Sequence, residues 1–166
     1  MQIRVSEIPD EGLRLLDPED IGRVYPEPEW TLDAVDLTVE RQGRKVAITG
    51  GFQATAHLAC SRCLEPLVTQ IEPEVELELV PQPSSRQGQI ELGRDDLAVD
   101  FYQADVLDVG GLLRSETDLA LPMKPLCRPE CRGLCPICGA DRNDTDCGCV
   151  EVDDDPRWAA LRSLEL

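Results

Sequence analysis

Six of the eight cysteines in this chain lie in one short stretch, from Cys127 to Cys149. Within it, Cys135-Pro-Ile-Cys138-Gly139 has the sequence of a zinc knuckle. Proline and glycine turn the backbone of a knuckle tightly, so both sulfurs face one ion and backbone N–H groups can donate to the thiolates. Cys147 and Cys149 follow closely, so the segment holds enough thiolates for one tetrahedral site. The spacing predicts metal binding, with zinc as the ion.

Two zinc sites are favoured over one, because the eight cysteines divide into two sets of four. One set closes locally, and the other joins the first two cysteines of the C-terminal stretch to a distant C-x-x-C pair. The sets are Cys135, Cys138, Cys147 and Cys149, and Cys60, Cys63, Cys127 and Cys131. A different grouping places Cys131 and Cys135 in one site and leaves Cys127 spare. Spacing alone leaves both groupings open.

The cysteine pattern argues against catalysis. An all-cysteine zinc site is closed, whereas catalytic zinc keeps an open position and usually has His or Glu among its ligands. The ferredoxin-type C-x2-C-x2-C run of iron–sulfur proteins is absent. His57, the one histidine, is expected in a cross-strand polar role. With no nucleophile–base set or phosphate-binding glycine loop in view, we expect a protein that is not an enzyme.

The net charge of −17 restricts the partners. Such a chain repels a phosphate backbone over most of its surface, and it suits a basic partner protein better. The charge could equally serve solubility alone. One local contrast is the basic group beside the cysteines, in which Arg128, Arg132 and Arg142 could touch RNA. The alternative is that these arginines only neutralise the thiolates.

The location of the chain bears on its cysteine chemistry. No apolar run approaches the ~20 residues of a membrane span, and the first residues lack the apolar stretch of a signal peptide. We therefore expect a cytoplasmic protein with no membrane association. Thiols stay reduced in the cytoplasm, which favours metal binding over disulfides. A thioredoxin-like role for Cys60-Ser-Arg-Cys63 is disfavoured, because β patterns flank it where a helix N-terminus would be needed.

The elements that must position these cysteines are mainly strands. Alternating apolar residues predict strands over 3–8, around Leu37 to Val39, from Val46 to Leu58, over 67–71, over 75–79 and over 97–101. Gly50-Gly51 is expected to form a bulge or bend, and Arg41-Gln-Gly-Arg44 a turn. Residues 81–88 have the composition of a mobile loop.

Helices are fewer. Asp17-Pro18 predicts the start of a short helix, with Asp as N-cap and Pro at the first position. Residues 105–121 repeat apolar side chains at helical spacing and could lie on the open face of the sheet. The residues after Pro156 predict a last helix.

The expected fold is α+β, with a mainly antiparallel sheet or partly open barrel, a packing helix and a C-terminal all-cysteine zinc segment. The predicted domains are a β-rich core over 1–122, a zinc-binding segment over 123–150 and a terminal helix over 151–166.

Two motifs carry a resemblance to a known family. Leu58-Ala-Cys60-Ser-Arg-Cys63-Leu64 after a strand, and Gly133-Leu-Cys135-Pro-Ile-Cys138-Gly139 with the closing Cys147-Gly-Cys149, resemble the bacterial YceD family over nearly the whole chain. The resemblance implies a non-enzymatic factor in biogenesis of the large ribosomal subunit and accumulation of its rRNA. Taken together with the net charge of −17, the resemblance favours a precursor of that subunit or a basic ribosomal protein as partner. A competing hypothesis is a cytosolic regulator that responds to zinc or to oxidation.

Overall fold

The computed structural model describes residues 1–83 and 99–150, and the chain divides into two compact units. Unit 1 comprises Met1–Leu58 and Val68–Met123, and unit 2 comprises Ala59–Leu67 and Lys124–Leu166. The predicted division at residues 122 and 123 remains a prediction. The predicted terminal helix over 151–166 and most of the predicted loop over 81–88 lie outside the described residues.

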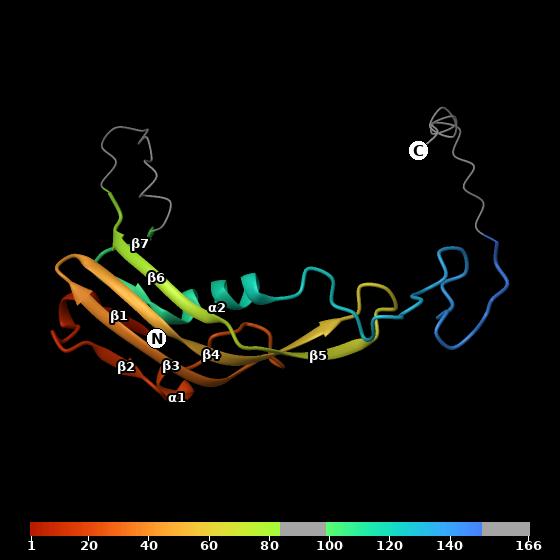
Figure 1. The fold of residues 1–166 in the computed structure, drawn as a ribbon, viewed down its shortest axis with the longest axis horizontal. Helices are drawn as coiled ribbons and strands as arrows, with labels where there is room; N and C mark the ends of the chain where they lie inside the picture. Colours follow the sequence, from red (N-terminus) through yellow and green to blue (C-terminus); the bar gives the residue numbers. More distant parts are fainter. Residues whose placement is uncertain (84–98, 151–166) are drawn as a thin grey trace, which may run out of the picture. The chain divides into compact units, whose positions relative to one another are not determined.

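A mixed sheet forms the frame of unit 1 (Figure 1). Its strands are β2 (Leu13–Leu15), β3 (Thr31–Gln42), β4 (Lys45–Ala59), β5 (Pro66–Ile71), β6 (Glu74–Pro81) and β7 (Val99–Tyr102). The order is β2-β3-β4-β6-β7, and β5 pairs with β4 off this path. The pairs β2–β3, β3–β4 and β4–β6 are antiparallel, whereas β6–β7 is parallel. This is the α+β arrangement expected, but the described strands form an open sheet and no barrel.

The predicted turn between β3 and β4 is confirmed. Gln42 pairs with Lys45, so Gly43 and Arg44 connect the strands, and Gly43 has a left-handed φ of 66°. A bulge or a bend was expected at Gly50-Gly51. The bulge is wrong, since both glycines pair in regular register with β3 and the register of this pair shifts between Leu32 and Ala34 instead. Gly50 is needed for another reason: at its φ of 134°, an added Cβ would lie 2.1 Å from the carbonyl oxygen of Asp36.

The N-terminal elements differ in part from the expectation. The strand predicted over 3–8 ends early, because β1 (Gln2–Arg4) is followed by the 3-10 turn η1 (Val5–Glu7). The short helix is confirmed as α1 (Pro18–Ile21), and Asp17 caps it by accepting a 2.8 Å hydrogen bond from the amide of Glu19.

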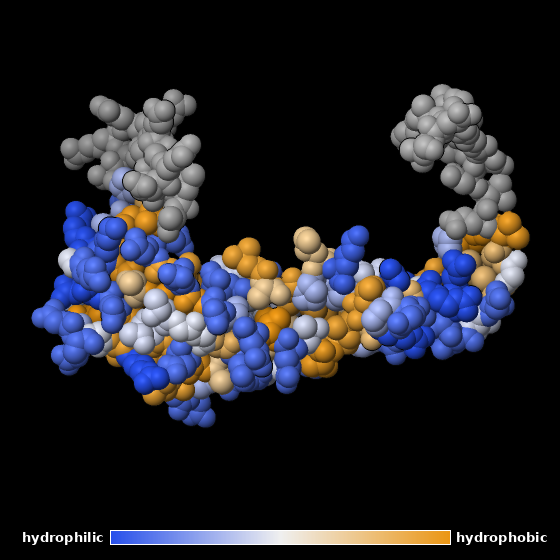
Figure 2. All heavy atoms as spheres, in the orientation of Figure 1, coloured by the Kyte–Doolittle hydropathy of each residue, from blue (hydrophilic) through white to orange (hydrophobic). Residues whose placement is uncertain are grey.

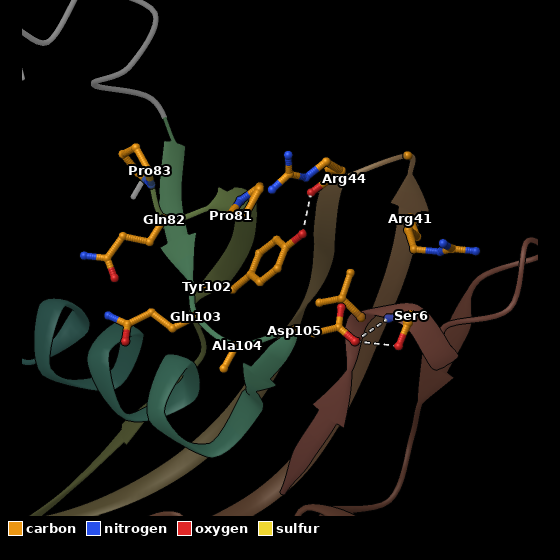
Figure 3. Close-up of a pocket in the computed structure, with 12 residues that line it drawn as sticks. Ser6, Arg41, Arg44, Pro81, Gln82, Pro83, Tyr102, Gln103, Ala104 and Asp105 are labelled. Atoms are coloured by element: carbon orange, nitrogen blue, oxygen red, sulfur yellow. Dashed lines mark hydrogen bonds between the residues drawn. The ribbon is translucent and has the colours of Figure 1, made fainter. Parts of the chain in front are cut away.

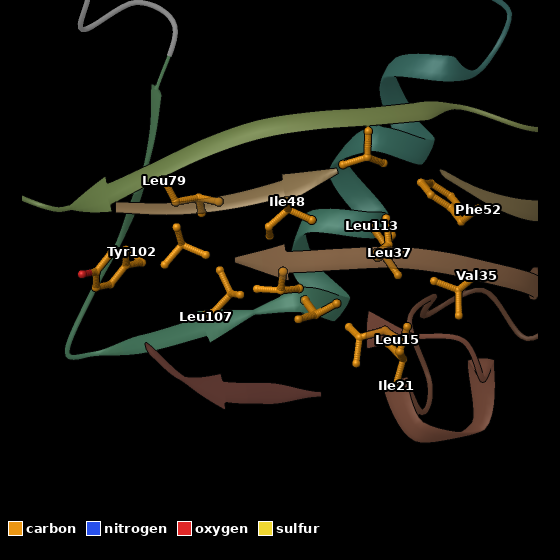
Figure 4. Close-up of a cluster of buried hydrophobic side chains, with 14 of the residues drawn as sticks. Leu15, Ile21, Val35, Leu37, Ile48, Phe52, Leu79, Tyr102, Leu107 and Leu113 are labelled. Carbon is orange, nitrogen blue, oxygen red and sulfur yellow. The ribbon is translucent and has the colours of Figure 1, made fainter. Parts of the chain in front are cut away.

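Helix α2 (Val109–Ala120) starts later than the periodicity predicted. Its expected first turn instead forms β8 (Val106–Asp108), which pairs with β1, and the Asp108 side chain caps the helix at the Gly111 amide. Leu113 of α2 packs in one buried cluster with residues of the sheet such as Leu37 and Ile48, as Figure 4 shows. The expected packing of this helix on the sheet is therefore confirmed.

Unit 2 has little regular structure in its described part. The end of β4, the start of β5 and the chain from Lys124 to Val150 belong to it, and a single β-bridge joins Leu134 to Asp141. Its buried cluster consists of Cys60, Cys63 and Cys131 rather than aliphatic side chains. Across residues 1–83 and 99–150, no helix is both long and apolar enough to cross a bilayer.

Candidate metal centre

The connection between β4 and β5 carries the first C-x-x-C pair. The Leu64 amide donates a 2.9 Å hydrogen bond to the Cys60 carbonyl, and the Cys60 amide donates one of 2.9 Å to the Glu65 carbonyl. Leu64 has a left-handed φ of 64°, which completes the tight turn. Cys60 and Cys63 are buried, with exposed fractions of 0% and 7%. The turn thus presents two sulfurs inward from one short loop.

Two downstream cysteines complete the first cluster. The sulfur of Cys60 lies 3.8 Å from that of Cys131, and the sulfur of Cys63 lies 3.6 Å from that of Cys127. All four sulfurs lie within 4.8 Å of one another. Four thiolates around one zinc at about 2.3 Å give sulfur separations of about 3.8 Å, so the cluster has the dimensions of a tetrahedral zinc site.

Main-chain hydrogen bonds hold the two halves of this cluster together. The Ser61 amide donates to the Pro125 carbonyl at 2.8 Å, and the Leu134 amide donates to the Arg62 carbonyl at 2.9 Å. The guanidinium of Arg62 also donates to the Cys131 carbonyl at 2.8 Å. These bonds place the C-x-x-C turn against the segment from residue 125 to residue 134.

The second cluster is built around the predicted knuckle. The Gly139 amide donates to the Cys135 carbonyl at 2.9 Å, and Gly139 has a φ of 75°. The knuckle therefore repeats the geometry of the first turn, with Gly139 in the place of Leu64. The cluster consists of the sulfurs of Cys135, Cys138, Cys147 and Cys149, which also lie within 4.8 Å of one another. Cys138 and Cys149 are exposed, so solvent reaches this cluster more easily than the first.

The electrostatics of both clusters favour a cation. Hydrogen bonds from backbone amides, first that of Cys127, lower the pKa of Cys60 to about 6, while burial raises the pKa of Cys127 to about 12. In the second cluster, the amide of Cys138 lowers the pKa of Cys135 to about 6, and the neighbouring thiols raise the pKa of Cys149 to about 12. Four adjacent thiols cannot all ionise by themselves, whereas a divalent cation stabilises four thiolates together. The two clusters can therefore each hold a metal ion.

One further residue contacts the first cluster. The side-chain amide nitrogen of Asn143 lies 3.5 Å from the sulfur of Cys131. Its hydrogen bond is the main cause that lowers the pKa of Cys131. The sequence pattern did not indicate Asn143, nor Arg62, because neither is a ligand type and both act through contacts between distant segments.

The remaining predicted residues lie outside the clusters. Arg128, Arg132 and Arg142 are exposed on unit 2. His57 belongs to neither cysteine cluster, and its ring nitrogen lies 3.8 Å from the Glu29 carboxylate. Every cysteine that was predicted as a ligand lies in one of the two clusters, and Cys131 and Cys135 are in different ones.

A cavity of about 720 Å³ lies in unit 1, and some of the polar groups that line it are paired with each other or with the backbone (Figure 3). The Tyr102 hydroxyl that lines it donates to the Arg44 carbonyl at 2.9 Å. The Asp105 carboxylate there accepts hydrogen bonds from the amide and hydroxyl of Ser6. These hydrogen bonds join segments of unit 1 that are far apart in the chain.

Comparison with known proteins places the cysteine clusters in a family context. The family model described as "Large ribosomal RNA subunit accumulation protein YceD" matches residues 48–165. This range includes all eight cysteines. No solved structure matches the chain.

Curated relatives come from bacteria and plants. An uncharacterized protein of Mycobacterium tuberculosis is 35% identical over 132 residues, covering 76% of this chain and 59% of the relative. The chloroplastic protein named "Large ribosomal RNA subunit accumulation protein YCED homolog 1" is 31% identical over 142 residues in Zea mays, covering 71% of this chain and 48% of the relative. Its Arabidopsis thaliana counterpart is 24% identical over 159 residues, covering 82% and 50%. The chain thus spans about half to three-fifths of the length of these relatives.

Proposed function

The chain belongs to the YceD family, and from that premise we propose that it is a non-enzymatic zinc-binding factor in biogenesis of the large ribosomal subunit. In this role it supports accumulation of large-subunit rRNA by contacting a basic ribosomal protein or a subunit precursor. The observation that carries the proposal is the pair of four-cysteine clusters inside the region that the family model matches.

Zinc suits these clusters better than other metals. Soft thiolate ligands select zinc or iron–sulfur clusters, and four thiolates in a tetrahedral set are typical of structural zinc. With all four positions taken by cysteine, no position remains for a substrate. Structural zinc can contribute ~10 kcal/mol or more in apparent binding free energy, which exceeds the net stability of many domains. In unit 2, where aliphatic core is scarce, the metal would supply most of the stability.

The solvent face of the sheet supports a basic protein as partner. A hollow of about 500 Å³ lies where Gly50 and Gly51 leave β4 without side chains, and the acidic residues Asp36, Glu72 and Glu74 are among those that line it. On the face shown in Figure 2, hydrophobic side chains occur in scattered groups among hydrophilic ones. The acidic residues at the hollow are therefore the feature that favours a basic partner.

Part of this charge is already compensated within the chain. Arg14 pairs with Asp36 at 2.8 Å, and Lys45 pairs with Glu78 at 3.3 Å. Glu74 and Glu76 have no such partner among the described residues. They point from alternate positions of β6, about 7 Å apart. An extended polypeptide with lysine or arginine at alternate positions has the same period, so a basic arm of a ribosomal protein would match these carboxylates.

Direct contact with RNA would be local. A net charge of −17 opposes the counterion release that drives RNA binding, so only the exposed arginines of unit 2 would meet phosphates. Among them, we propose Arg128, Arg132 and Arg142, beside the cysteine clusters, as the contacts. A cytoplasmic location is part of the same proposal, since reduced thiols are needed for metal binding.

The test is binding at physiological salt to purified basic ribosomal proteins and to fragments of large-subunit rRNA. The variant Glu74→Gln/Glu76→Gln should bind the basic proteins several-fold more weakly. The control Glu11→Gln/Glu27→Gln alters two exposed glutamates of unit 1 that lie outside the strands and changes the net charge equally. Submicromolar, salt-dependent binding to naked rRNA with none to the basic proteins would reject the partner-protein proposal.

A regulatory role is the second candidate, and the exposure of Cys138 and Cys149 is what favours it. Exposed thiolates are oxidised more readily than buried ones, so peroxide could release the metal from the second cluster. Zinc release at low peroxide together with a change in partner binding would support this role. Retention of both ions under the same conditions would contradict the regulatory role and support a structural role for the metal.

A further inference from the structure

In the sequence, Asn143 lies between Cys138 and Cys147 of the second cluster, yet its side chain contacts the first cluster. The amide nitrogen of the side chain donates to the Cys131 sulfur at 3.5 Å and to the Asp141 carboxylate at 2.7 Å. The side-chain oxygen accepts a 2.8 Å hydrogen bond from the Arg132 amide. Both hydrogens of the amide and its oxygen are therefore used.

The loop that carries Asn143 is tied into the second cluster at both ends. It covers residues 139–146 and follows Cys138 directly, and Cys147 follows it. The Cys135 amide donates to the Ala140 carbonyl at 2.8 Å, and the Arg142 amide donates to the Gly133 carbonyl at 2.9 Å. Metal held by Cys138 and Cys147 would fix the ends of this loop and hence the position of Asn143.

We propose that Asn143 couples the two metal sites, so that metal at the second cluster raises the affinity of the first. The proposal rests on metal binding at both clusters, as put forward above. Asn143 acts here as a positioning residue: it orients the Cys131 sulfur through an N–H donor and binds no metal itself.

The physical basis is the second shell of a metal site. Donors to a ligand atom fix its orientation, and their loss typically costs about 10–100-fold in metal affinity. When the second cluster is empty, the loop has lost the restraint at its ends, and ordering Asn143 then opposes binding at the first cluster. Coupling between two sites is reciprocal, so the first metal must raise the affinity of the second cluster by the same factor. If Asn143 only stabilised its own loop through Asp141, loss of its N–H donor would not weaken metal binding at the first cluster. Metal at the second cluster would then leave the affinity of the first unchanged.

The first experiment compares two charge-matched variants in the full chain. Asn143→Asp keeps the oxygen that accepts from Arg132 but removes the N–H donor to Cys131. Thr145→Asp adds the same charge in the same loop, where Thr145 is exposed and bonds Asp141 through its backbone amide. Zinc affinity of each cluster is measured by competition with a chromophoric chelator under reducing conditions. We expect Asn143→Asp to weaken the first cluster about 10–100-fold and Thr145→Asp to leave it within a few-fold.

A spectroscopic readout separates the sulfur contact from a general loss of structure. With Co²⁺ in place of zinc, removal of the N–H donor raises the energy of the sulfur lone pair. The sulfur-to-cobalt charge-transfer band of the first cluster should then move to longer wavelength in Asn143→Asp. An unchanged band and unchanged affinity would overturn the proposal.

The second experiment tests coupling directly. Cys138→Ser/Cys149→Ser removes the second site, and the zinc affinity of the first cluster should fall about 5–150-fold. Cys60→Ser/Cys63→Ser should lower the affinity of the second cluster by the same factor. Asn143→Asp should have little further effect once the second site is gone. Two ions bound with independent affinities would overturn the coupling alone, whereas absence of bound metal in the full chain would overturn the metal proposal itself.

Discussion

The backbone amide of Leu134 donates a 2.9 Å hydrogen bond to the carbonyl oxygen of Arg62, in the middle of the first C-x-x-C turn. The residue before Leu134 is Gly133, which is buried and has a left-handed φ of 70°. A Cβ added to Gly133 would lie 2.8 Å from that same carbonyl oxygen. The close approach of these two backbones brings Cys131 and Cys135 to their respective clusters from either side of Gly133.

Gly133→Ala should therefore destabilise unit 2 strongly. The matched control is Gly139→Ala, because Gly139 also has a left-handed φ, of 75°, but a Cβ added there would meet nothing within 4 Å. Both variants incur the cost of a left-handed alanine, and Gly133→Ala adds a steric cost of about 1–3 kcal/mol. Chelator-induced zinc loss and proteolysis of unit 2 measure the difference. Equal behaviour of the two variants would contradict the close approach.

Metal removal should proceed in two steps. Metal analysis should find two zinc ions per chain, and a chelator should take the ion of the second cluster first because Cys138 and Cys149 are exposed. The first cluster, with Cys60, Cys63 and Cys131 buried, should release its ion more slowly. Cys138→Ser/Cys149→Ser should retain only the slow step. A single ion per chain with four thiols that react readily in the native state would count against two sites.

Leu64→Gly should stabilise the first turn. Leu64 has a φ of 64° and a side chain that is 65% exposed, so the substitution relieves left-handed strain and loses little burial. The relief of about 1–2 kcal/mol exceeds the entropic cost of glycine, about 0.5–1 kcal/mol. The control Leu119→Gly, at a 79% exposed position within α2, should instead destabilise by about 1 kcal/mol. Denaturant unfolding measures both, and a destabilised Leu64→Gly would show that the leucine side chain makes contacts that outweigh the strain.

The buried hydroxyl of Tyr25 gives a pH-dependent prediction. It lies 2.8 Å from Thr117 Oγ1, and Thr117 donates in turn to the Leu113 carbonyl, so Tyr25 is the donor of this pair. Burial raises the pKa of Tyr25 above its usual value. The folded state thus holds the phenol proton more tightly than the unfolded state. The stability that protonated Tyr25 contributes is fully present below its unfolded pKa of about 10, and it is lost as the pH rises through its folded pKa.

The free energy of unfolding should accordingly fall above pH ~10, by at most about 1.4 kcal/mol per pH unit from this residue. Tyr25→Phe should cost about 0.5–1.5 kcal/mol at neutral pH through the lost hydrogen bond. It should also flatten the alkaline decline. Urea unfolding of both proteins between pH 8 and pH 11 is the measurement, and parallel curves would mean that Tyr25 ionises equally in both states.

Much of the fold could be predicted from local pattern. Alternation of Val75, Leu77 and Leu79 with glutamates predicted β6, since side chains on a strand alternate between its two faces. Asp17 and Pro18 predicted the start of α1, because capping and a fixed φ act within a few residues. Helix α2 was predicted too early, because Val106 fits a helical repeat but pairs with Arg4 of β1, a partner more than 100 residues away.

The sequence by itself determined that this chain carries eight thiols in sets suited to metal, since cysteine type and spacing decide what a short segment can bind. It also determined the acidic character, which is a sum over residues. Only the tertiary structure decided which sulfurs meet, because the turn at Cys60 and the segment at Cys127 are far apart in the chain and are joined by hydrogen bonds between backbones. For the same reason only the structure revealed Asn143 beside Cys131: an amide is no ligand, and its role comes from a contact between two loops that no local pattern encodes.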